Sequence, residues 1–156
     1  MPTRSHTAVT ELKSHIGYRM RVVSNAVSYS FARQLAGSDV TVAEWVILRE
    51  MYSQVQTTSP STVANITGLT RGAVSKLIDR LLQKGFVARA ESTTDRRYQE
   101  IKLTAVAKKL VPKLARIADE NDDRFFSVLS DSERKTLMKI LIKVADIHQL
   151  NSNPIE

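Results

Sequence analysis

The stretch LTRGAVSKLIDRLLQKGFVARAESTTDRRYQEIKL, at residues 69–103, decides the fold. Its first half repeats apolar residues at the spacing of a helix with one buried face. The repeating positions are Val74, Leu77, Ile78, Leu81 and Leu82. We expect the hydroxyl of Thr70 to cap this helix, and Lys84 and Gly85 to end it. The second half alternates apolar and polar residues around a charged tip, which predicts a β-hairpin.

A short helix is predicted immediately before this unit. Residues 54–60 form a polar segment that we expect to be a loop, and Ser59 is followed by Pro60, a residue favoured at the first position of a helix. Gly68 should end this helix, so that a short glycine-containing turn joins it to the next one. Two helices joined in this way predict a helix-turn-helix, and the hairpin behind them would be its wing.

This arrangement is typical of duplex DNA binding, because a helix fills the major groove and its first residues reach the base edges. The candidate DNA-binding residues of the second helix are Thr70, Arg71, Gly72, Ala73, Ser75, Lys76 and Arg80. Arg71 can pair bidentately with guanine, and Gly72 would allow close approach of the backbone to DNA. At the start of the first helix, the hydroxyls of Ser59, Ser61 and Thr62 suit a phosphate, but helix capping explains each of them equally well.

The tip of the predicted hairpin carries the motif Asp95, Arg96, Arg97. An arginine on such a tip gains from the negative potential of a narrow minor groove, and a neighbouring carboxylate can hold its guanidinium in place. Motifs of this kind are also common as solvated turn charges. In this chain the motif follows a helix of the DNA-binding type, and that position makes the functional interpretation more specific.

Long helical patterns flank this core on both sides. Residues 10–36 keep one apolar stripe through several turns. Its members are Leu12, Ile16, Met20, Val23, Val27, Phe31 and Leu35. A helix this long exceeds what a small winged core can cover, so we expect it to pack against a second copy of the chain. Packing within its own chain is the alternative.

Capping residues mark the starts of the other helices. Thr41 and Glu44 form a capping box that opens a helix to about residue 53. Thr104 should cap a helix that the interior Pro112 kinks. A second capping box begins the last helix at Ser130. The predicted fold class is therefore mainly α with a small β-hairpin wing, a winged helix-turn-helix core flanked by long helices.

The charge of the chain is concentrated around the opening stretch. The formal net charge is +7, and residues 60–104 contribute +4 of it in less than a third of the chain. Basic character alone fits solubility, but a localised positive field is the footprint of a nucleic-acid binder.

Composition excludes several other classes of protein. With no cysteine, the chain has no disulfide framework, thiolate zinc site or thiol-based oxidant sensor. The three histidines lack paired spacing, so no metal or other cofactor is predicted. We find no apolar run of membrane-spanning length and no secretory signal, and we expect a cytoplasmic protein without a membrane partner.

Residues 61–104 resemble the winged helix-turn-helix core of the MarR (multiple antibiotic resistance regulator) family. The resemblance is carried by GLTRGAVSKLIDRLLQKGFVAR, by the DRR motif of the tip and by IKLT after it. The long flanking helices extend it over nearly the whole chain. The chain departs from the family where LTAVAKK replaces the frequent LTEKG, which affects only the start of the following helix.

The resemblance implies a twofold dimer whose two winged domains grip one pseudo-palindromic DNA site. It implies that Arg97 is the minor-groove arginine, that Asp95 orients it and that Arg96 is a backbone neighbour. The expected domains are then a dimerisation helix at 1–36, the DNA-binding domain at 37–104, dimerisation helices at 105–150 and a disordered tail at 151–156.

Many relatives also bind a small anionic or phenolic effector between the dimer helices and the DNA-binding lobe. The candidates for such a contact in this chain are His15, Tyr18, Arg19, Trp45 and Arg49. Packing or surface charge explains each of them as well, and for Trp45 a role as a core anchor is the leading alternative.

The predicted function is a dimeric, sequence-specific transcription regulator, a repressor released by a small effector. The alternative is a winged-helix protein-interaction module whose basic face meets an acidic partner. An enzyme is not expected, because the sequence has no nucleophile–base pair, metal cluster or glycine-rich phosphate loop.

Overall fold

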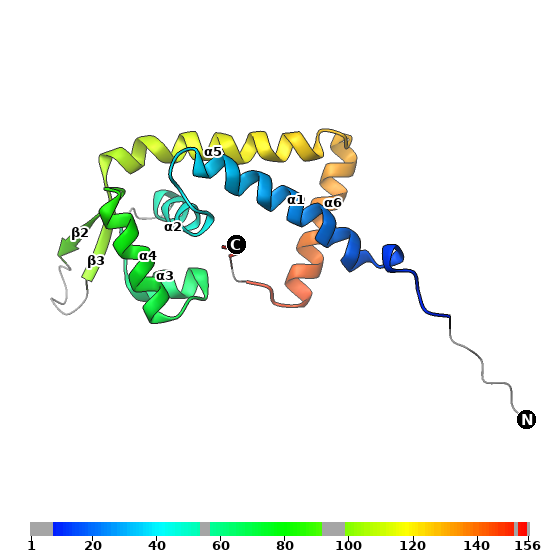
Figure 1. Ribbon diagram of the computed structural model, residues 1–156, viewed down its shortest axis with the longest axis horizontal. Helices are drawn as coiled ribbons and strands as arrows, with labels where there is room; N and C mark the ends of the chain where they lie inside the picture. Colours follow the sequence, from blue (N-terminus) through cyan, green and yellow to red (C-terminus); the bar gives the residue numbers. More distant parts are fainter. Residues whose placement is uncertain (1–7, 54–56, 92–98, 152, 156) are drawn as a thin grey trace, which may run out of the picture.

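Two long helices, α1 (Ile16–Ala36) and α5 (Ala105–Phe126), pack against each other and carry a lobe at one end. Figure 1 shows α5 running along the molecule with α1 beside it, the lobe at the left and α6 (Asp131–Ile147) at the opposite end. This computed structural model describes residues 8–53, 57–91, 99–151 and 153–155. It confirms the predicted fold class, mainly α with a small antiparallel sheet.

The lobe is built from α2 (Val42–Ser53), α3 (Pro60–Thr67), α4 (Arg71–Gln83) and a small sheet. Four of the five stripe residues of α4 are buried as predicted, Leu82 is partly buried, and the stripe belongs to one core with residues of α2, α3, β2, β3 and α5. The fully buried side chains of this core include Leu35, Ile47, Leu48, Val63, Leu77, Leu81, Ile101 and Leu114. Burial of this stripe orients α4, because it leaves only the opposite face of the helix exposed.

Glycines end both helices of the helix-turn-helix. Gly68 follows α3 with φ of 69°, and Gly85 follows α4 with φ of 72°, a region that side-chain-bearing residues rarely adopt. Their positive φ values turn the chain sharply, first from α3 into α4 and then from α4 into the sheet. Both turns were predicted from the sequence.

The sheet has three strands, in the order β1 (Thr57–Thr58), β3 (Gln99–Leu103), β2 (Val87–Glu91), and all pairs are antiparallel. The β2–β3 hairpin was predicted, and it runs from the pair Val87 and Leu103 outward. The expected loop at 54–60 was wrong in part, because Thr57 pairs with Lys102 to form a two-residue strand.

The predicted helix at 10–36 was also wrong at its start. Helix α1 begins at Ile16, because His15 is extended with φ −77° and ψ 128°, and a short 3-10 helix, η1 (Leu12–Ser14), precedes it. Only Leu35 of the predicted stripe is fully buried, whereas Ile16, Met20 and Val23 remain about half exposed or more. The first turns of α1 therefore hold an apolar surface that this single chain does not cover.

A buried amide joins α1 to α5. Asn121 is 2% exposed; its Nδ2 donates to the carbonyl oxygen of Val27 at 3.2 Å, and its Oδ1 accepts from Nε2 of Gln34 at 3.1 Å. Satisfying both ends of a buried amide avoids the cost of an unpaired polar group. Helix α5 also continues as one helix from Ala105 to Phe126 through Pro112.

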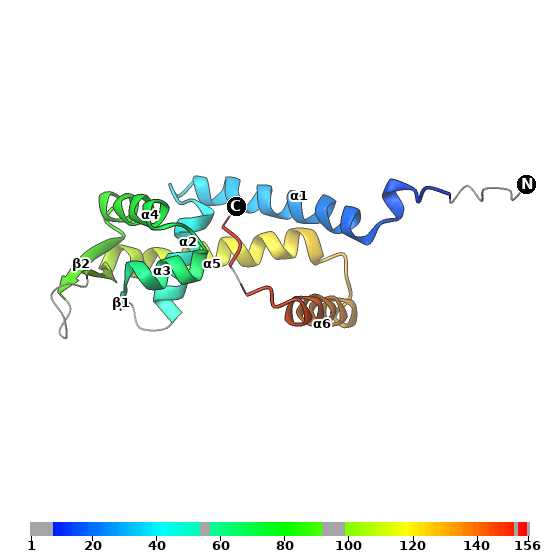
Figure 2. The ribbon, with the colours of Figure 1, turned by 90° about the horizontal axis from the view of Figure 1, so that it is seen from below.

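The last helix begins at the predicted capping box, in which Ser130 and Glu133 each accept a backbone N–H of the other. Beyond α6 the chain turns back toward the lobe, which Figure 2 shows from below. There Nδ2 of Asn153 donates to the carbonyl oxygen of Ile66 in α3 at 3.2 Å. Asn153 thus satisfies one of the carbonyls that a helix end leaves free.

Trp45 lies where α1 meets α2. Its ring meets that of Phe31 edge-on, with centroids 6.1 Å apart and planes at 79°. Both side chains are half-buried and pack against the core of the lobe. This packing agrees with the expectation that Trp45 is an anchor.

Candidate nucleic-acid interface

The exposed face of α4 carries the polar residues predicted to meet DNA. Oγ1 of Thr70 accepts the N–H of Ala73 at 3.3 Å, so Thr70 is the N-cap of this helix. Arg71, Gly72 and Lys76 are exposed, as are Ser75 and Arg80, while Ala73 is half-buried. A helix whose first turns are exposed and basic can enter a groove of DNA from that end.

A groove between α3 and α4 brings candidates from both helices together. Its volume is about 460 Å³. Its lining includes the predicted residues Ser59, Ser61, Arg71 and Ser75, together with Asp79 of α4 and Arg89 of β2. Hydroxyl and guanidinium donors from two helices therefore open on one concave surface, which suits an anionic partner.

One of the hydroxyls at the start of α3, that of Ser59, acts as a cap. Oγ of Ser59 accepts the N–H of Thr62 at 3.2 Å and lies 3.0 Å from Oγ1 of the same residue. Of the two interpretations of these residues, helix capping is thus present for Ser59. A phosphate contact by Ser59, Ser61 or Thr62 stays a prediction.

The residues of the predicted wing tip, Asp95, Arg96 and Arg97, lie outside the described residues. What the structure places is the base of the wing. Oγ1 of Thr104 donates to the carbonyl oxygen of Gly85 at 2.6 Å and accepts the N–H of Ala107 at 3.3 Å. One hydroxyl thereby joins the end of α4, the return of the hairpin and the start of α5.

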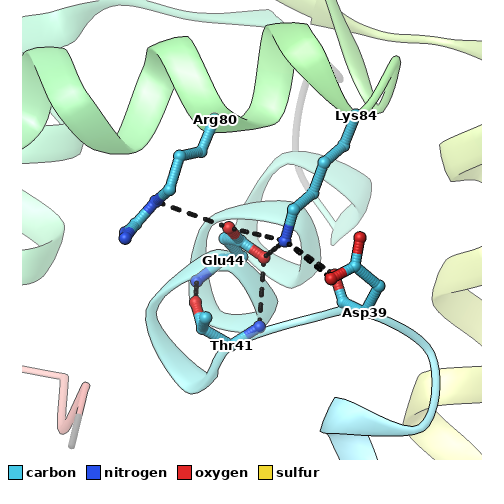
Figure 3. Close-up of polar contacts among 5 residues, drawn as sticks. All are labelled: Asp39, Thr41, Glu44, Arg80 and Lys84. Atoms are coloured by element: carbon cyan, nitrogen blue, oxygen red, sulfur yellow. Dashed lines mark hydrogen bonds and ion pairs between the residues drawn. The ribbon is translucent and has the colours of Figure 1, made fainter.

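A buried carboxylate anchors the far end of α4, and the sequence analysis did not find it. Glu44 is fully buried, and its carboxylate accepts from Nζ of Lys84 at 2.9 and 3.1 Å. Nε of Arg80 lies 3.6 Å from Oε1 of the same group (Figure 3). Nζ of Lys84 also donates to the carbonyl oxygen of Asp39 at 2.7 Å. The sequence offered only the capping box of Glu44, because its ionic partners lie far along the chain.

The capping box itself is confirmed. Oε2 of Glu44 accepts the N–H of Thr41 at 3.0 Å, and Oγ1 of Thr41 accepts the N–H of Glu44 at 3.2 Å. The carboxylate is therefore held by the backbone at the start of its own helix as well as by the two cations. Figure 3 shows these contacts converging on Glu44 from α2 and α4.

The five effector candidates do not form one cluster. Trp45 lines a hollow of about 200 Å³ together with Ser28, Phe31, Val42, Val46 and Pro154. His15, Tyr18 and Arg19 lie at the start of α1, where Nε of Arg19 donates to the carbonyl oxygen of Lys13 at 2.8 Å. Arg49 hydrogen-bonds Ser53 on the exposed side of α2. Of these five, only Trp45 borders that hollow.

A second hollow, of about 380 Å³, was not predicted. It is lined by Tyr29, Ser30, Arg33, Gln34, Arg124 and Phe125. The guanidinium of Arg33 lies 5.6 Å from the ring centroid of Tyr29, within the range of a cation–π contact. Two arginines from α1 and α5 meet here only because the two helices cross, and spacing along the chain could not reveal this.

Over the described ranges, no group of three or more histidine and acidic side chains is arranged to hold a metal ion. None of the helices in the described part of the chain is both long enough and apolar enough to cross a membrane.

Comparison with known proteins points to one family. The model of the MarR family matches residues 38–97. BpsR of Bordetella bronchiseptica, whose DNA binding is regulated by 6-hydroxynicotinic acid, has a TM-score of 0.75 at 23% identity, over 89% of this chain and 99% of its own. CouR of Rhodococcus jostii, bound to p-coumaroyl-CoA, has a TM-score of 0.73 at 23% identity, over 88% and 96%.

A mutant MarR of E. coli, solved in complex with operator DNA, is also similar. Its TM-score is 0.71 at 22% identity, over 83% of this chain and 92% of its own. At these identities the structural likeness establishes the fold alone. The match to the family model is a similarity of sequence, over residues 38–97. Residues 38–97 therefore match the model of the MarR family, and the chain has the fold of these solved proteins.

Proposed function

We propose that the protein is a dimeric transcription regulator that binds duplex DNA at a specific site. The observation that carries this proposal is the exposed basic face at the start of α4, beside a groove that also collects the hydroxyls of α3. A helix presented in this way fits the major groove, with Arg71 and Ser75 toward base edges and Lys76 toward phosphates. The wing would then reach the adjacent minor groove with Arg97, oriented by Asp95.

Dimerisation is the second part of the proposal. Large apolar side chains remain exposed on the first turns of α1 and along α6, on the side of the molecule away from the lobe. Those of α6 are Met138, Ile140, Leu141, Ile142, Val144 and Ile147. An exposed apolar surface of this extent favours a partner, and a second copy would place two α4 helices on one pseudo-palindromic site.

Release by a small molecule is the third part. Of the similar proteins, BpsR is regulated by 6-hydroxynicotinic acid and CouR is bound to p-coumaroyl-CoA, and both molecules are anionic and contain a ring. An effector of the anionic or phenolic class, acting on a repressor in the cytoplasm, is the corresponding proposal here. The hollow beside Trp45 is the place where we would look for it first.

The test is a binding titration. A labelled duplex selected from a randomised pool by the wild-type protein, and an unselected duplex of the same length, are titrated at several salt concentrations. We expect tighter binding to the selected duplex and a steep loss of affinity as salt rises, because phosphate contacts release counterions. If the protein binds neither duplex at low salt, the proposed function is wrong and the protein-interaction module is favoured instead.

Two substitutions test the mode of binding. Arg97→Ala should weaken binding to both duplexes with the fold unchanged, because a minor-groove arginine acts largely through charge and groove width. Arg71→Ala should instead reduce the preference for the selected duplex by about 1–3 kcal/mol, the worth of a bidentate base contact. Unchanged affinity and preference in both variants would exclude this docking mode.

A further inference from the structure

One buried carboxylate serves two cations of α4 that differ in exposure. Around Glu44, the side chain of Lys84 is 21% exposed and that of Arg80 is 52% exposed. Lys84 also donates to the backbone of Asp39, so its ammonium is directed into the protein. Arg80 is the cation of the pair that can reach a partner in solvent.

The geometry of Arg80 leaves its outer edge available. Its Nε is the atom that faces Glu44, at 3.6 Å, which is an ion-pair distance longer than a hydrogen bond. In Figure 3 the terminal nitrogens of the guanidinium extend away from the carboxylate. Because the guanidinium is a planar fork with five N–H donors, one edge can pair with Glu44 while the terminal groups bind something else.

The position of Arg80 on α4 indicates what that partner is. Arg80 follows the exposed Lys76 by four residues, so both cations lie along one side of the helix. It lies well behind the first turn, whose residues reach the base edges when such a helix docks. A cation at this distance from the helix start, on the exposed side, is placed to meet the phosphate backbone that borders the groove.

We propose that Glu44 is a positioning residue, which holds Arg80 by Nε so that its terminal N–H groups bind a DNA phosphate. The inference rests on the proposed DNA-binding function and adds to it a residue of α2, outside the helix-turn-helix. Glu44 is suited to this role because its carboxylate is already fixed by the N–H of Thr41. The arginine is thereby ordered before DNA arrives, which lowers the entropic cost of the contact.

The deciding variant is Arg80→Lys, which keeps the charge and removes the fork. The lysine ammonium has no separate Nε and terminal edges, so it cannot be held by Glu44 through one edge while a second, fixed edge faces the phosphate. We therefore expect Arg80→Lys to bind an unselected labelled duplex roughly tenfold more weakly at low salt, the usual worth of a charged hydrogen bond. The slope of log affinity against log salt should fall by about 0.9 per subunit, the value for one lost phosphate contact.

A second pair of variants tests the part played by Glu44. Glu44→Gln should give the same loss of slope, and combining it with Arg80→Lys should give no further loss, because both changes remove one contact. Lys84→Gln is the matched control: it alters the other cation on Glu44, and we expect a lower unfolding temperature with an unchanged salt slope. Circular dichroism and thermal unfolding of each variant verify that it is folded.

The outcomes separate this inference from the proposed function. If the wild-type protein does not bind duplex DNA at low salt, the proposed function itself fails. If the wild type binds and Arg80→Lys matches it in affinity and slope, the oriented fork is excluded. If Arg80→Lys loses the contact but folded Glu44→Gln does not, Arg80 binds phosphate without Glu44 and the positioning role is wrong. Should Glu44→Gln fail to fold, Glu44→Asp, which keeps the charge but shortens the side chain by one methylene and withdraws it from Arg80, replaces it in this comparison.

Discussion

Gly72 is the second residue of α4, and a methyl group added there would meet no atom within 4 Å. Glycine inside a helix costs up to about 1 kcal/mol relative to alanine, so Gly72→Ala should raise the free energy of unfolding by a few tenths to about 1 kcal/mol. If the backbone of α4 approaches DNA closely, the same methyl group should weaken binding. The prediction is therefore a variant that is more stable in urea unfolding and binds duplex DNA less tightly.

The control for this prediction is Gly17→Ala. Gly17 is likewise the second residue of its helix, α1, and a methyl group there also meets open space. It should give a similar gain in stability with no loss of DNA affinity. Equal DNA affinity of Gly72→Ala and the wild type would mean that Gly72 is a neutral surface residue.

Glu44 shows how far single residues could be predicted. Its capping box with Thr41 follows from residues three apart, and the structure confirms it. Its burial and its pairing with Lys84 span 40 residues and arise only when α2 packs on α4. Local chemistry was therefore predictable, whereas the ionic cluster depends on tertiary packing that no short pattern encodes.

Among whole elements, α5 depends most on one residue at its start. Thr104 caps α5 and donates to the carbonyl oxygen of Gly85, so it ties this helix to the end of α4. Thr104→Val keeps the shape of the side chain and removes the hydroxyl. The N–H of Ala107 and the carbonyl oxygen of Gly85 then lose this partner. We expect a loss of about 1–2 kcal/mol in the free energy of unfolding, measured in urea.

Thr104→Ser is the control, because serine keeps the hydroxyl and loses only a methyl group. It should retain most of the stability that Thr104→Val loses. Comparable losses in the two variants would show that the methyl group, and not the hydroxyl, is what stabilises the junction.

The boundaries of helices were predictable where the sequence has a capping residue or a glycine that ends the helix. Helix α4 begins and ends as expected, because Thr70 and Gly85 mark its limits. Helix α1 was predicted too long, since the apolar stripe continues through Leu12 although His15 is extended. The strand at Thr57 was missed, because two residues carry no periodicity and their partners in β3 lie more than 40 residues away.

At the scale of the whole molecule, the apolar side chains left exposed on α6 predict an oligomer. Ile140, Val144 and Ile147 form one stripe, and they are 53%, 47% and 71% exposed. If this stripe is buried between two copies, a charge within it should dissociate the dimer. Ile140→Glu should therefore sediment as a monomer in analytical ultracentrifugation at concentrations where the wild type is a dimer, and bind DNA more weakly.

Lys139→Glu is the matched control for that experiment. Lys139 is the exposed neighbour of Ile140, and the substitution introduces the same acidic group outside the apolar stripe. It should remain dimeric. Dissociation of both variants would indicate that net charge, not the stripe, governs assembly.

The candidate site was predictable to the extent that it is local. The groove residues Ser59, Arg71 and Ser75 come from two helices joined by a short turn, so their proximity follows from the helix-turn-helix. The hollow with Arg33 and Arg124 could not be predicted, because those residues are about 90 positions apart and meet where α1 crosses α5. Long-range crossings of this kind decide where a small molecule could be held.

The packing of Trp45 has a practical consequence. It is the only tryptophan of the chain, and its ring lies against Phe31 of α1 in a hollow that Pro154 of the C-terminal segment also borders. Emission excited selectively from this one indole thus reports on the junction of three separate parts of the molecule. A compound entering the hollow, or a shift of α2 against α1, would change its intensity or wavelength, so the unlabelled protein carries its own optical sensor for effector screening.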